Sequence, residues 1–333
     1  MATIKDVARK ANVGIGTVSR VINESSEVSP NTRRKVKKAI QDLDYTPNIT
    51  ARRLSLGKTW QIGVVLPYLT LPSYVERLRG VQQALGGTDY YPILYSVGNP
   101  AQRDEYLATL SEKTQVDGLL VISMPLSPPQ TAKIHANQIP TVLIDACNQT
   151  IPHIVVDDVT GGRMAVEHLI ELGHTRIGFL SDYLDTPFQH SGKDRYHGYR
   201  EALDGHNIPY QAQYVVEGDR GRENARRLAL QLLELDSPPT AIFASSDTHA
   251  IGVLDAAGEI GVNVPDQLSV IGYDGIRDAE YLNLTTISQP LFETGVRGAE
   301  LLLNLINGED PPFRSCELPL KLLERGTTTR APD

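Results

Sequence analysis

Residues 3–22 read TIKDVARKANVGIGTVSRVI, and this stretch decides the first part of the fold. Thr3, followed three residues later by Asp6, is typical of a helix N-cap, and the apolar residues behind it keep helical spacing. The tripeptide NVG at 12–14 indicates a tight turn, because Asn and Gly tolerate the backbone angles that a turn needs. Helical spacing resumes over 15–22. Two short helices joined by such a turn predict a helix-turn-helix unit, whose second helix enters the major groove of DNA.

A third helix is predicted to follow this pair. Ser29 and Pro30 form its cap, and Tyr45-Thr46-Pro47 ends it. Its inward residues are Val36, Ala39, Ile40 and Leu43, while Arg33, Arg34, Lys35, Lys37 and Lys38 are expected in water. The next segment, NITARRLSLG at 48–57, has room for one or two helical turns. Because isolated helices of that length are unstable in water, we expect it to fold against a partner such as DNA.

Charge is distributed unevenly along the 333 residues. The net charge is −8 overall, but residues 1–60 hold twelve Lys or Arg against five acidic residues. The first 60 residues therefore carry +7 and the remaining 273 carry −15. A basic head attracts DNA phosphates while an acidic body is repelled by them. The alternative from charge alone is a solvated helical face.

Length and composition restrict the class of protein. The chain exceeds the size of one growing core, so we expect a small module and a larger body divided into lobes. No apolar run reaches the roughly 18 residues that a membrane span needs, and the start MATIKDVARK has no signal-peptide core. The two cysteines, Cys147 and Cys316, cannot build a disulfide framework or a four-thiolate metal site. We therefore expect a cytoplasmic, nucleoid-associated protein without metal or cofactor.

From Gln61 onward, short apolar runs alternate with helical patterns. The runs are QIGVVLP, PILYS, GLLVIS, PTVLI, IVVD, RIGFLS, YVVE, TAIFA and LSVIGY. Helical patterns lie between them, at 72–86, 160–173 and 247–260. Buried β-branched strands that alternate with helices predict parallel sheets built from βαβ units. The rhythm occurs about twice, which predicts two similar lobes.

Polar residues repeatedly follow the apolar runs. Sites in parallel sheets lie at the carboxyl ends of the strands, so these residues are candidates for ligand contact. They are Tyr68, Tyr74, Ser123, Asp145, Ser246, Asp247 and Asp274. Taken singly, each is better explained as a helix cap or turn residue, because Ser and Asp favour those positions. Their recurrence at one edge favours a site.

At this point the sequence resembles a known family. ATIKDVARKANV, GTVSRVIN, VSPNTRRKV and LDYTPNITARRL resemble the headpiece and hinge of the LacI/GalR repressors over about 56 residues. The resemblance implies major-groove contacts from the second helix, phosphate contacts at Asn23 and Tyr45, and a hinge helix in the minor groove that inserts Leu54 between bases. The DNA-binding residues it implies are Thr3, Gly14, Ile15, Gly16, Thr17, Ser19, Arg20, Asn23, Tyr45, Asn48, Ala51, Arg52 and Leu54.

The recognition helix departs from better-known members of that family. Ile15 and Gly16 stand where those members carry polar or aromatic side chains, and neither can make a bidentate hydrogen bond to a base. Arg20 is then the best remaining reader of guanine. Ile15 is suited to a thymine methyl group, and the alternative is that it belongs to the core.

The body resembles the same family through GGRMAVEHLIELGHTRIGFL, DRYHGYREAL, ASSDTHAIGVL, VPDQLSVIGYDG and LTTISQP. The resemblance implies a ligand stacked on Tyr74, with Arg195 and Asp274 gripping vicinal hydroxyls through a fork of donors and a pure acceptor. Arg220 stands where several relatives have an aromatic residue. It is either simply exposed or selects a larger, more polar or anionic ligand. The implied effector site comprises Tyr68, Tyr74, Ser123, Asp145, Gln189, Ser191, Arg195, Arg220, Ser246, Asp247 and Asp274.

These observations predict an all-α helix-turn-helix headpiece followed by an α/β body of two lobes like periplasmic binding proteins. The expected boundaries are 1–46 for the headpiece, 47–58 for the hinge and 59–333 for the effector-binding and dimerisation domain. We expect a ligand-responsive transcriptional repressor. It binds a pseudo-palindromic operator in double-stranded DNA as a homodimer, with a sugar or sugar derivative as effector. A purine is the less frequent effector among relatives.

Three other classes fit less well. An enzyme is disfavoured because no nucleophile elbow, P-loop, HExxH or dinucleotide-binding motif is found, and His168 and His174 have weak metal spacing. An exported sugar-binding protein would carry a signal peptide in place of the basic headpiece. A DNA-binding protein with a purely architectural body remains an alternative.

Overall fold

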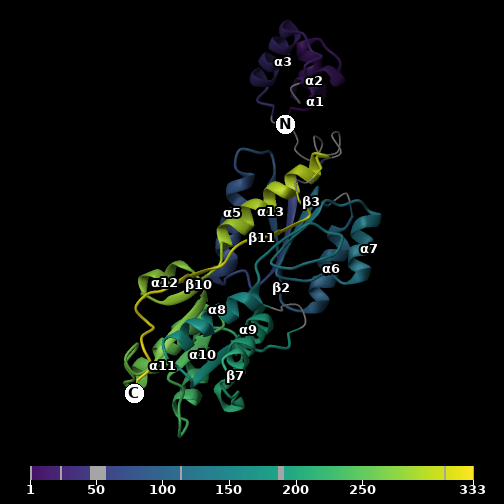
Figure 1. The fold of residues 1–333 in the computed structure, drawn as a ribbon. Coiled ribbons are helices and arrows are strands. Elements are labelled where there is room, and N and C mark those ends of the chain that lie inside the picture. The colour runs from purple at the N-terminus through teal and green to yellow at the C-terminus, as the bar shows by residue number, and fades with distance from the viewer. Residues whose placement is uncertain are drawn as a thin grey trace. The chain divides into compact units, whose positions relative to one another are not determined.

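The structure, a computed structural model, describes residues 2–22, 25–45, 58–112, 115–186, 191–310 and 313–332. Its contacts divide the chain into two units, residues 1–60 and 61–333. Most of the predicted hinge, including Asn48, Ala51, Arg52 and Leu54, falls outside the described residues, as do Asn23 and Gln189. The two units are described separately (Figure 1).

The first unit contains the three predicted helices, α1 (Ile4–Ala11), α2 (Ile15–Ile22) and α3 (Pro30–Asp42). Thr3 caps α1 through a capping box with Asp6, and Asn12 ends it in the left-handed conformation at φ 51°. The Ser29 hydroxyl accepts from the Thr32 amide at the start of α3. The predicted helix-turn-helix is confirmed: the first helix ends at Ala11 and the second begins at Ile15.

A small core joins these helices. Val7, Val18 and Val36, one from each helix, are fully buried in it. Arg33 departs from the expectation that all five cations of α3 lie in water. It is half-buried, and its Nη2 donates to the Ser25 carbonyl at 2.6 Å, which ties α3 to the loop before it.

The second unit contains two lobes, each built on a six-stranded sheet. The first sheet has the order β11-β5-β4-β3-β1-β2 and is parallel throughout. Helices α5, α6 and α13 pack against its strands, and we call this assembly the first lobe. Its elements are β1 (Gln61–Pro67), α5 (Pro72–Leu85), β2 (Tyr91–Val97), α6 (Pro100–Leu110), β3 (Gly118–Ile122), α7 (Pro128–Ala136), β4 (Thr141–Ile144), β5 (His153–Val155), α13 (Leu291–Ile306) and β11 (Ser315–Glu317).

The sheet of the second lobe repeats this plan, with the order β12-β10-β9-β8-β6-β7. It is parallel except where β12 pairs with β10. Its elements are α8 (Asp158–Glu171), β6 (Ile177–Asp182), α9 (Ser191–Gly205), a 3₁₀ turn (Ala212–Tyr214), β7 (Val215–Gly218), α10 (Arg222–Leu233), β8 (Ala241–Ala244), α11 (Asp247–Ile260), β9 (Ser269–Asp274), α12 (Arg277–Tyr281), β10 (Thr285–Ser288) and β12 (Lys321–Leu323). The predicted α/β architecture is confirmed, and β10, β11 and β12 are additions to it.

Three connections cross between the lobes. The chain passes from β5 to α8, returns from β10 to α13, and crosses again from β11 to β12. In each sheet the strand order reverses, between β1 and β3 and between β6 and β8, and such switch points open a crevice at the carboxyl ends of the strands. The topology therefore places two crevices where the lobes meet.

Pairs of glycines bring helices into backbone contact. A Cβ on Gly80 of α5 would lie 2.0 Å from the Phe292 carbonyl oxygen of α13, and one on Gly295 would lie 2.0 Å from that of Arg77. Gly162 of α8 and Gly198 of α9 form the same kind of crossing, at 2.2 and 2.1 Å. These crossings fix the helices that carry residues of the site described below.

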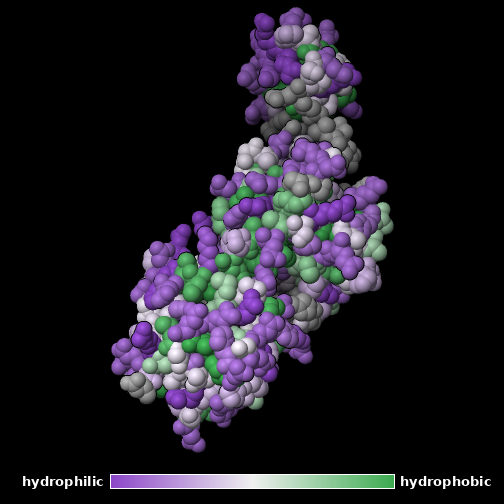
Figure 2. All heavy atoms as spheres, viewed as in Figure 1, coloured by the Kyte–Doolittle hydropathy of each residue, from purple (hydrophilic) through white to green (hydrophobic). Residues whose placement is uncertain are grey.

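The surface of this unit is largely hydrophilic in the view of Figure 2, with hydrophobic residues showing over α13. Phe292 at the start of α13 is one of the exposed large apolar residues, together with Tyr281 and Leu282. Among the described residues, no helix combines the length and the apolar character that a membrane crossing requires.

Candidate functional site

The start of α2 presents most of its predicted DNA-binding residues to solvent. Gly14, Ile15, Gly16 and Arg20 are exposed, and Thr17 and Ser19 are half-buried. Ile15 is 45% exposed, whereas Val18, one turn further on, is fully buried. Ile15 is therefore not a core residue, and its apolar side chain is available to another molecule.

Three of the predicted DNA-binding residues contact other residues of the headpiece. The Arg20 guanidinium lies 3.5 Å from the Glu27 carboxylate, and both side chains are mostly exposed. The Thr3 hydroxyl is engaged with Asp6 in the capping box, so its role in this structure is to begin α1. Tyr45 is half-buried against the core of the three helices.

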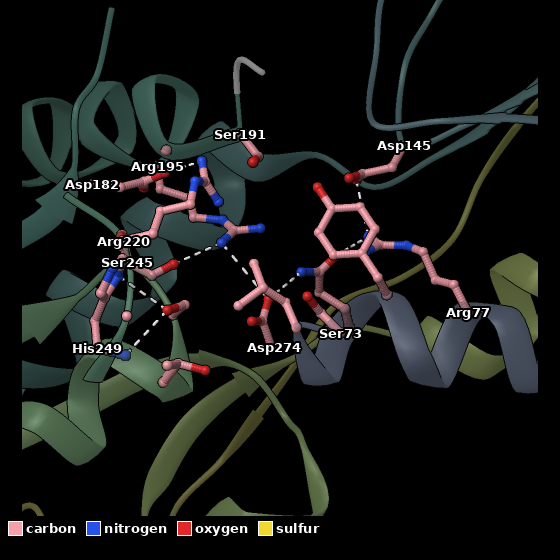
Figure 3. A pocket seen from close by; sticks show the side chains of 17 residues that line it. Ser73, Arg77, Asp145, Asp182, Ser191, Arg195, Arg220, Ser245, His249 and Asp274 are labelled. Carbon is pink, nitrogen blue, oxygen red and sulfur yellow. Dashed lines mark hydrogen bonds and ion pairs between the residues drawn. The ribbon is translucent and has the colours of Figure 1, made fainter. Parts of the chain in front are cut away.

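A cavity lies between the two lobes of the second unit, at the carboxyl ends of strands from both sheets (Figure 3). Its empty volume is about 580 Å³, which includes space open to solvent. The described residues that line it are Leu71, Ser73, Tyr74, Arg77, Asp145, Asp182, Ser191, Gly192, Arg195, Arg220, Gly221, Ser245, Ser246, Thr248, His249, Asp274 and Gln289.

The first lobe contributes a tyrosine and an ion pair. Tyr74 and Arg77 lie one turn apart on α5, and Nη2 of Arg77 is 3.1 Å from Asp145 Oδ1 at the end of β4. Ser123, at the end of β3, donates to the other Asp145 oxygen at 2.5 Å. Burial raises the pKa of Tyr74 to about 12, so its hydroxyl stays protonated at neutral pH.

Gln289 connects the two lobes through hydrogen bonds. Arg77 Nη2 donates to Gln289 Oε1 at 3.1 Å, and Gln289 Nε2 donates to Asp274 Oδ1 at 2.7 Å. Gln289 lies between β10 and α13, in one of the three crossing connections. A buried polar chain therefore runs from the first lobe to the end of β9 in the second.

Arg195 of α9 continues this chain. Its Nε donates to Asp158 at 2.8 Å, its Nη1 donates to the Ser245 carbonyl at 2.6 Å, and Nη1 lies 3.7 Å from Asp274 Oδ1. Its guanidinium also lies over the Tyr273 ring, 3.7 Å from the centroid. Burial alone would lower the pKa of Arg195, but Asp158 and Asp274 raise it, so the side chain stays charged.

Arg220 faces the cavity from the loop before α10. It forms an ion pair with Asp182, and its guanidinium lies 4.1 Å from the centroid of the Tyr68 ring. Asp182 ends β6 of the second lobe, whereas Tyr68 follows β1 of the first. Arg220 is therefore a second point of contact between the lobes. Figure 3 labels Arg220 and Asp182 at the left of the view.

Neutral donors and acceptors complete the second-lobe wall. His249 Nδ1 lies 3.0 Å from the hydroxyl oxygens of both Ser245 and Ser246. Burial lowers the pKa of His249 to about 4, so the imidazole is neutral at physiological pH. This corner of the cavity offers hydrogen-bonding groups without adding charge.

Burial also acts on the carboxyl groups of the cavity. It raises the pKa of Asp274 to about 6, although the guanidinium groups of Arg195 and Arg77 lower it. The pKa of Asp158 is raised for the same reason, against the effect of Arg195. Both carboxyl groups thus take up a proton more readily than a solvated aspartate does.

Four site residues have strained backbones. Tyr68, Ser123, Asp145 and Asp274 have φ values of 49°, 55°, 59° and 119°, and each ends or follows a central strand. Such conformations cost non-glycine residues of the order of 1–3 kcal/mol each, and they concentrate at ligand-binding positions. Here they turn the chain at the sheet edge, where their side chains gather.

The cavity contains seven of the predicted effector residues: Tyr74, Asp145, Ser191, Arg195, Arg220, Ser246 and Asp274. Tyr68 and Ser123 contact its lining, through Arg220 and Asp145. Asp247 was expected at the effector site, but it does not line the cavity. It is fully buried, and its oxygens accept from the Ile276 amide at 2.9 Å and from the Thr286 hydroxyl at 2.6 Å. Gln189 lies outside the described residues.

Several lining residues were not predicted. Asp182 follows an apolar strand as Asp145 and Asp274 do, so the same rule would have found it. Arg77, Gln289 and His249 carry no comparable local signal. Within the described residues, no group of three or more His, Cys, Asp or Glu side chains is placed to hold a metal ion.

Comparison with known protein families gives two matches. Residues 3–48 match the family described as bacterial regulatory proteins, lacI family. Residues 166–328 match a periplasmic binding protein-like domain. The two matches fall on the headpiece and on the body.

Individual proteins match over nearly the whole chain. Catabolite control protein A from Priestia megaterium is 34% identical over 98% of this chain and 99% of its own length. The structure of the Lac repressor dimer bound to operator and the anti-inducer ONPF has a TM-score of 0.84 at 29% identity, covering 98% and 99% of the two chains. A complex of the transcriptional regulator CelR with cellobiose has a TM-score of 0.71 at 30% identity, covering 98% and 100%.

Proposed function

This chain belongs to the lacI family of bacterial regulatory proteins, and from that premise we propose that it is a repressor whose operator affinity is set by a sugar or sugar derivative. Like its relatives, it is a DNA-binding transcriptional regulator and not an enzyme. We further propose that it acts in the cytoplasm, at the nucleoid. The two binding functions divide between the two units of the chain.

The headpiece supplies the DNA-binding half of the proposal. Basic residues outnumber acidic ones there, and α2 presents an exposed Ile15 and Arg20 at its surface. An arginine suits guanine and an aliphatic side chain suits a thymine methyl group. The proposed boundaries are 1–46 for this headpiece, 47–58 for a hinge and 59–333 for the effector domain. In the hinge, the proposed minor-groove residues are Asn48, Ala51, Arg52 and Leu54.

A homodimer on a pseudo-palindromic operator is the proposed assembly. Tyr281, Leu282 and Phe292 are exposed large apolar residues, and Tyr281 is 76% exposed. Phe292 also borders a surface groove with Glu280 and Leu291. Exposed apolar groups of this kind are favourable at an interface between subunits. The similar Lac repressor structure is a dimer on its operator.

One observation carries the effector half of the proposal: the buried chain Arg77–Gln289–Asp274–Arg195 crosses from lobe to lobe along the cavity wall. A sugar presents many hydroxyl groups, each both donor and acceptor, and this wall alternates donors with acceptors. The Nε of Arg77 has no hydrogen-bond partner among the described residues, which leaves a buried donor for a ligand oxygen. The similar CelR structure holds cellobiose.

The effector is tested by a thermal-shift screen of the full chain against sugars, sugar phosphates, nucleosides and purines, because a ligand of the folded state raises Tm. We expect a shift with a sugar that is lost in Arg195→Ala and Asp274→Ala. Arg222→Ala and Asp255→Ala remove a surface ion pair of the same type and should keep the shift. A shift only with purines or nucleosides would contradict a sugar effector.

The DNA-binding half is tested by selecting operators from a random DNA pool with the full chain. We expect an inverted repeat whose half-sites are occupied by two copies, and an affinity that changes when the effector is added. The direction of that change identifies the effector as inducer or co-repressor. Selection of one asymmetric site bound by one copy would contradict the dimer.

A further inference from the structure

The cationic side chains of the cavity are all neutralised by carboxylates. Three arginines are among the described lining residues, and each forms an ion pair: Arg77 with Asp145, Arg195 with Asp158, and Arg220 with Asp182. Asp274 lies against Arg195 as a further acceptor. Among the described lining residues, arginines and aspartates are therefore equal in number, and Asp158 adds one more carboxylate behind Arg195. These described residues give the cavity no excess of positive charge.

Burial makes this balance important for ligand choice. The side chains of Arg77 and Arg195 are 3% and 7% exposed, and Asp145, Asp182 and Asp274 are nearly as enclosed. Coulomb interactions are stronger in such an environment than in water. A phosphate would have to displace a carboxylate from an arginine or sit beside it, and both are costly. A hydroxyl group inserts between the two partners without changing the charge.

Arg220 is the cation that an entering anion would meet first. Its side chain is 22% exposed, more than those of Arg77 and Arg195, and it faces the cavity between Asp182 and the Tyr68 ring. Without Asp182, Arg220 would be a phosphate site, because a guanidinium binds phosphate through paired hydrogen bonds. Selectivity against phosphate therefore depends on Asp182, the carboxylate that pairs with Arg220.

We propose that the effector is uncharged, and that Asp182 is the residue that excludes phosphorylated ligands by neutralising Arg220. This inference rests on the proposed function and narrows the effector class to neutral polyhydroxylated molecules. Arg220 then selects by hydrogen bonding to hydroxyl groups. The alternative that an arginine at position 220 selects an anion does not account for the Arg220–Asp182 ion pair.

The test compares each neutral sugar with its phosphate ester, and adds inorganic phosphate as a probe, by calorimetry and thermal shift on the full chain. The variant is Asp182→Asn, which keeps the shape of the side chain and removes its charge. We expect the wild type to bind a neutral sugar at least about tenfold more tightly than its phosphate ester, and to show no shift with inorganic phosphate. Asp182→Asn should reduce that ratio at least about tenfold and gain a shift with inorganic phosphate.

Two control variants identify the cause of any gain. Asp255→Asn also leaves an arginine, Arg222, without its carboxylate, but outside the cavity, and it should behave as the wild type. Adding Arg220→Gln to Asp182→Asn should abolish the gain, because the freed cation is then absent. Thermal unfolding of each variant without ligand checks that it folds.

The possible outcomes separate the two proposals. If the wild type prefers the phosphate ester, or if Asp182→Asn leaves the ratio and the phosphate response unchanged, the inference is wrong while a sugar-type effector stands. If the wild type binds neither form of any sugar, the proposed effector class is wrong and the inference falls with it. Binding of phosphate to Asp182→Asn alone, reversed by Arg220→Gln, supports the assignment of Asp182.

Discussion

Arg77 and Gln289 are 212 positions apart in the chain and are joined by a buried hydrogen bond of 3.1 Å. Arg77 belongs to α5 of the first lobe, and Gln289 to the connection that returns from the second lobe. Because Gln289 also donates to Asp274, one amide side chain holds an arginine and an aspartate from different lobes. That amide is therefore one of the buried links between the two lobes.

Replacing this amide should weaken both the fold and the site. In Gln289→Met, which keeps the size of the side chain, Arg77 and Asp274 each lose a buried partner. We expect the free energy of unfolding to fall by about 1–3 kcal/mol and the effector affinity to fall with it, measured by urea unfolding and calorimetry. Gln82→Met, at an exposed position on α5, is the matched control. A Gln289→Met protein as stable as the wild type would show that the bridge contributes nothing.

The helix crossing between α8 and α9 should not tolerate a methyl group. In Gly198→Ala the new Cβ would lie 2.1 Å from the Val159 carbonyl oxygen, so α9 must move away from α8 and take Arg195 from Asp158. We expect a loss of more than about 2 kcal/mol in unfolding free energy, together with loss of effector binding. Gly205→Ala, in the same helix with nothing within 4 Å of its Cβ, should leave both unchanged. Equal effects at the two glycines would contradict this explanation.

Asp247 should make stability depend on pH. Burial raises its pKa to about 8, above the value of about 4 in an unfolded chain. The folded state therefore favours the protonated form, and this stabilisation is complete below about pH 4 and is lost as pH rises to about 8. Asp274 acts in the same direction but only up to about pH 6.

Over the interval from about pH 6.5 to 7.5, the difference in slope between the wild type and Asp247→Asn reports the contribution of Asp247. We expect the unfolding free energy of the wild type to fall there by up to about 1.4 kcal/mol per pH unit from this group, and Asp247→Asn to flatten the slope. Asp185→Asn, at an almost fully exposed position, should keep the wild-type slope. If the slopes of wild type and Asp247→Asn coincide, Asp247 is ionised throughout the range.

Ile15 and Val18 should separate DNA recognition from folding. Ile15 is exposed and Val18 is fully buried, although both are apolar and lie on α2. We expect Ile15→Ala to weaken operator binding about five- to tenfold by loss of apolar contact, with unchanged hydrogen exchange over residues 4–42. Val18→Ala should speed that exchange, because it opens a cavity worth about 1–3 kcal/mol. Unchanged operator affinity in Ile15→Ala would remove Ile15 from the interface.

The headpiece could be predicted almost entirely from sequence, because its signals are local. The Thr3 and Ser29 caps and the turn at Asn12 act within three residues of the helices they bound. Arg33 departed from prediction because its partner, the Ser25 carbonyl, lies in a loop whose path has no sequence signal. Helical spacing alone places Arg33 on the solvent-exposed face of α3.

The site could be predicted only where strand ends determine it. Asp145 and Asp274 were found by that rule, since a parallel sheet brings the ends of its strands to one edge. Asp247 was misplaced because it follows β8 but turns inward, to the Thr286 hydroxyl. Gln289 was missed because its importance arises from two partners that the fold brings to it from distant positions.

The three crossings between the lobes mean that neither lobe is a continuous piece of chain. The first lobe needs α13 and β11, which are made after most of the second lobe. A ribosome that has just completed β10 has therefore produced an unfinished first lobe, with the face that α13 covers still open. A single cut in a connection between the lobes would therefore not separate two complete lobes, because each fragment would lack strands or helices of its lobe. Neither lobe can therefore complete its sheet until the last strands, β11 and β12, have been made.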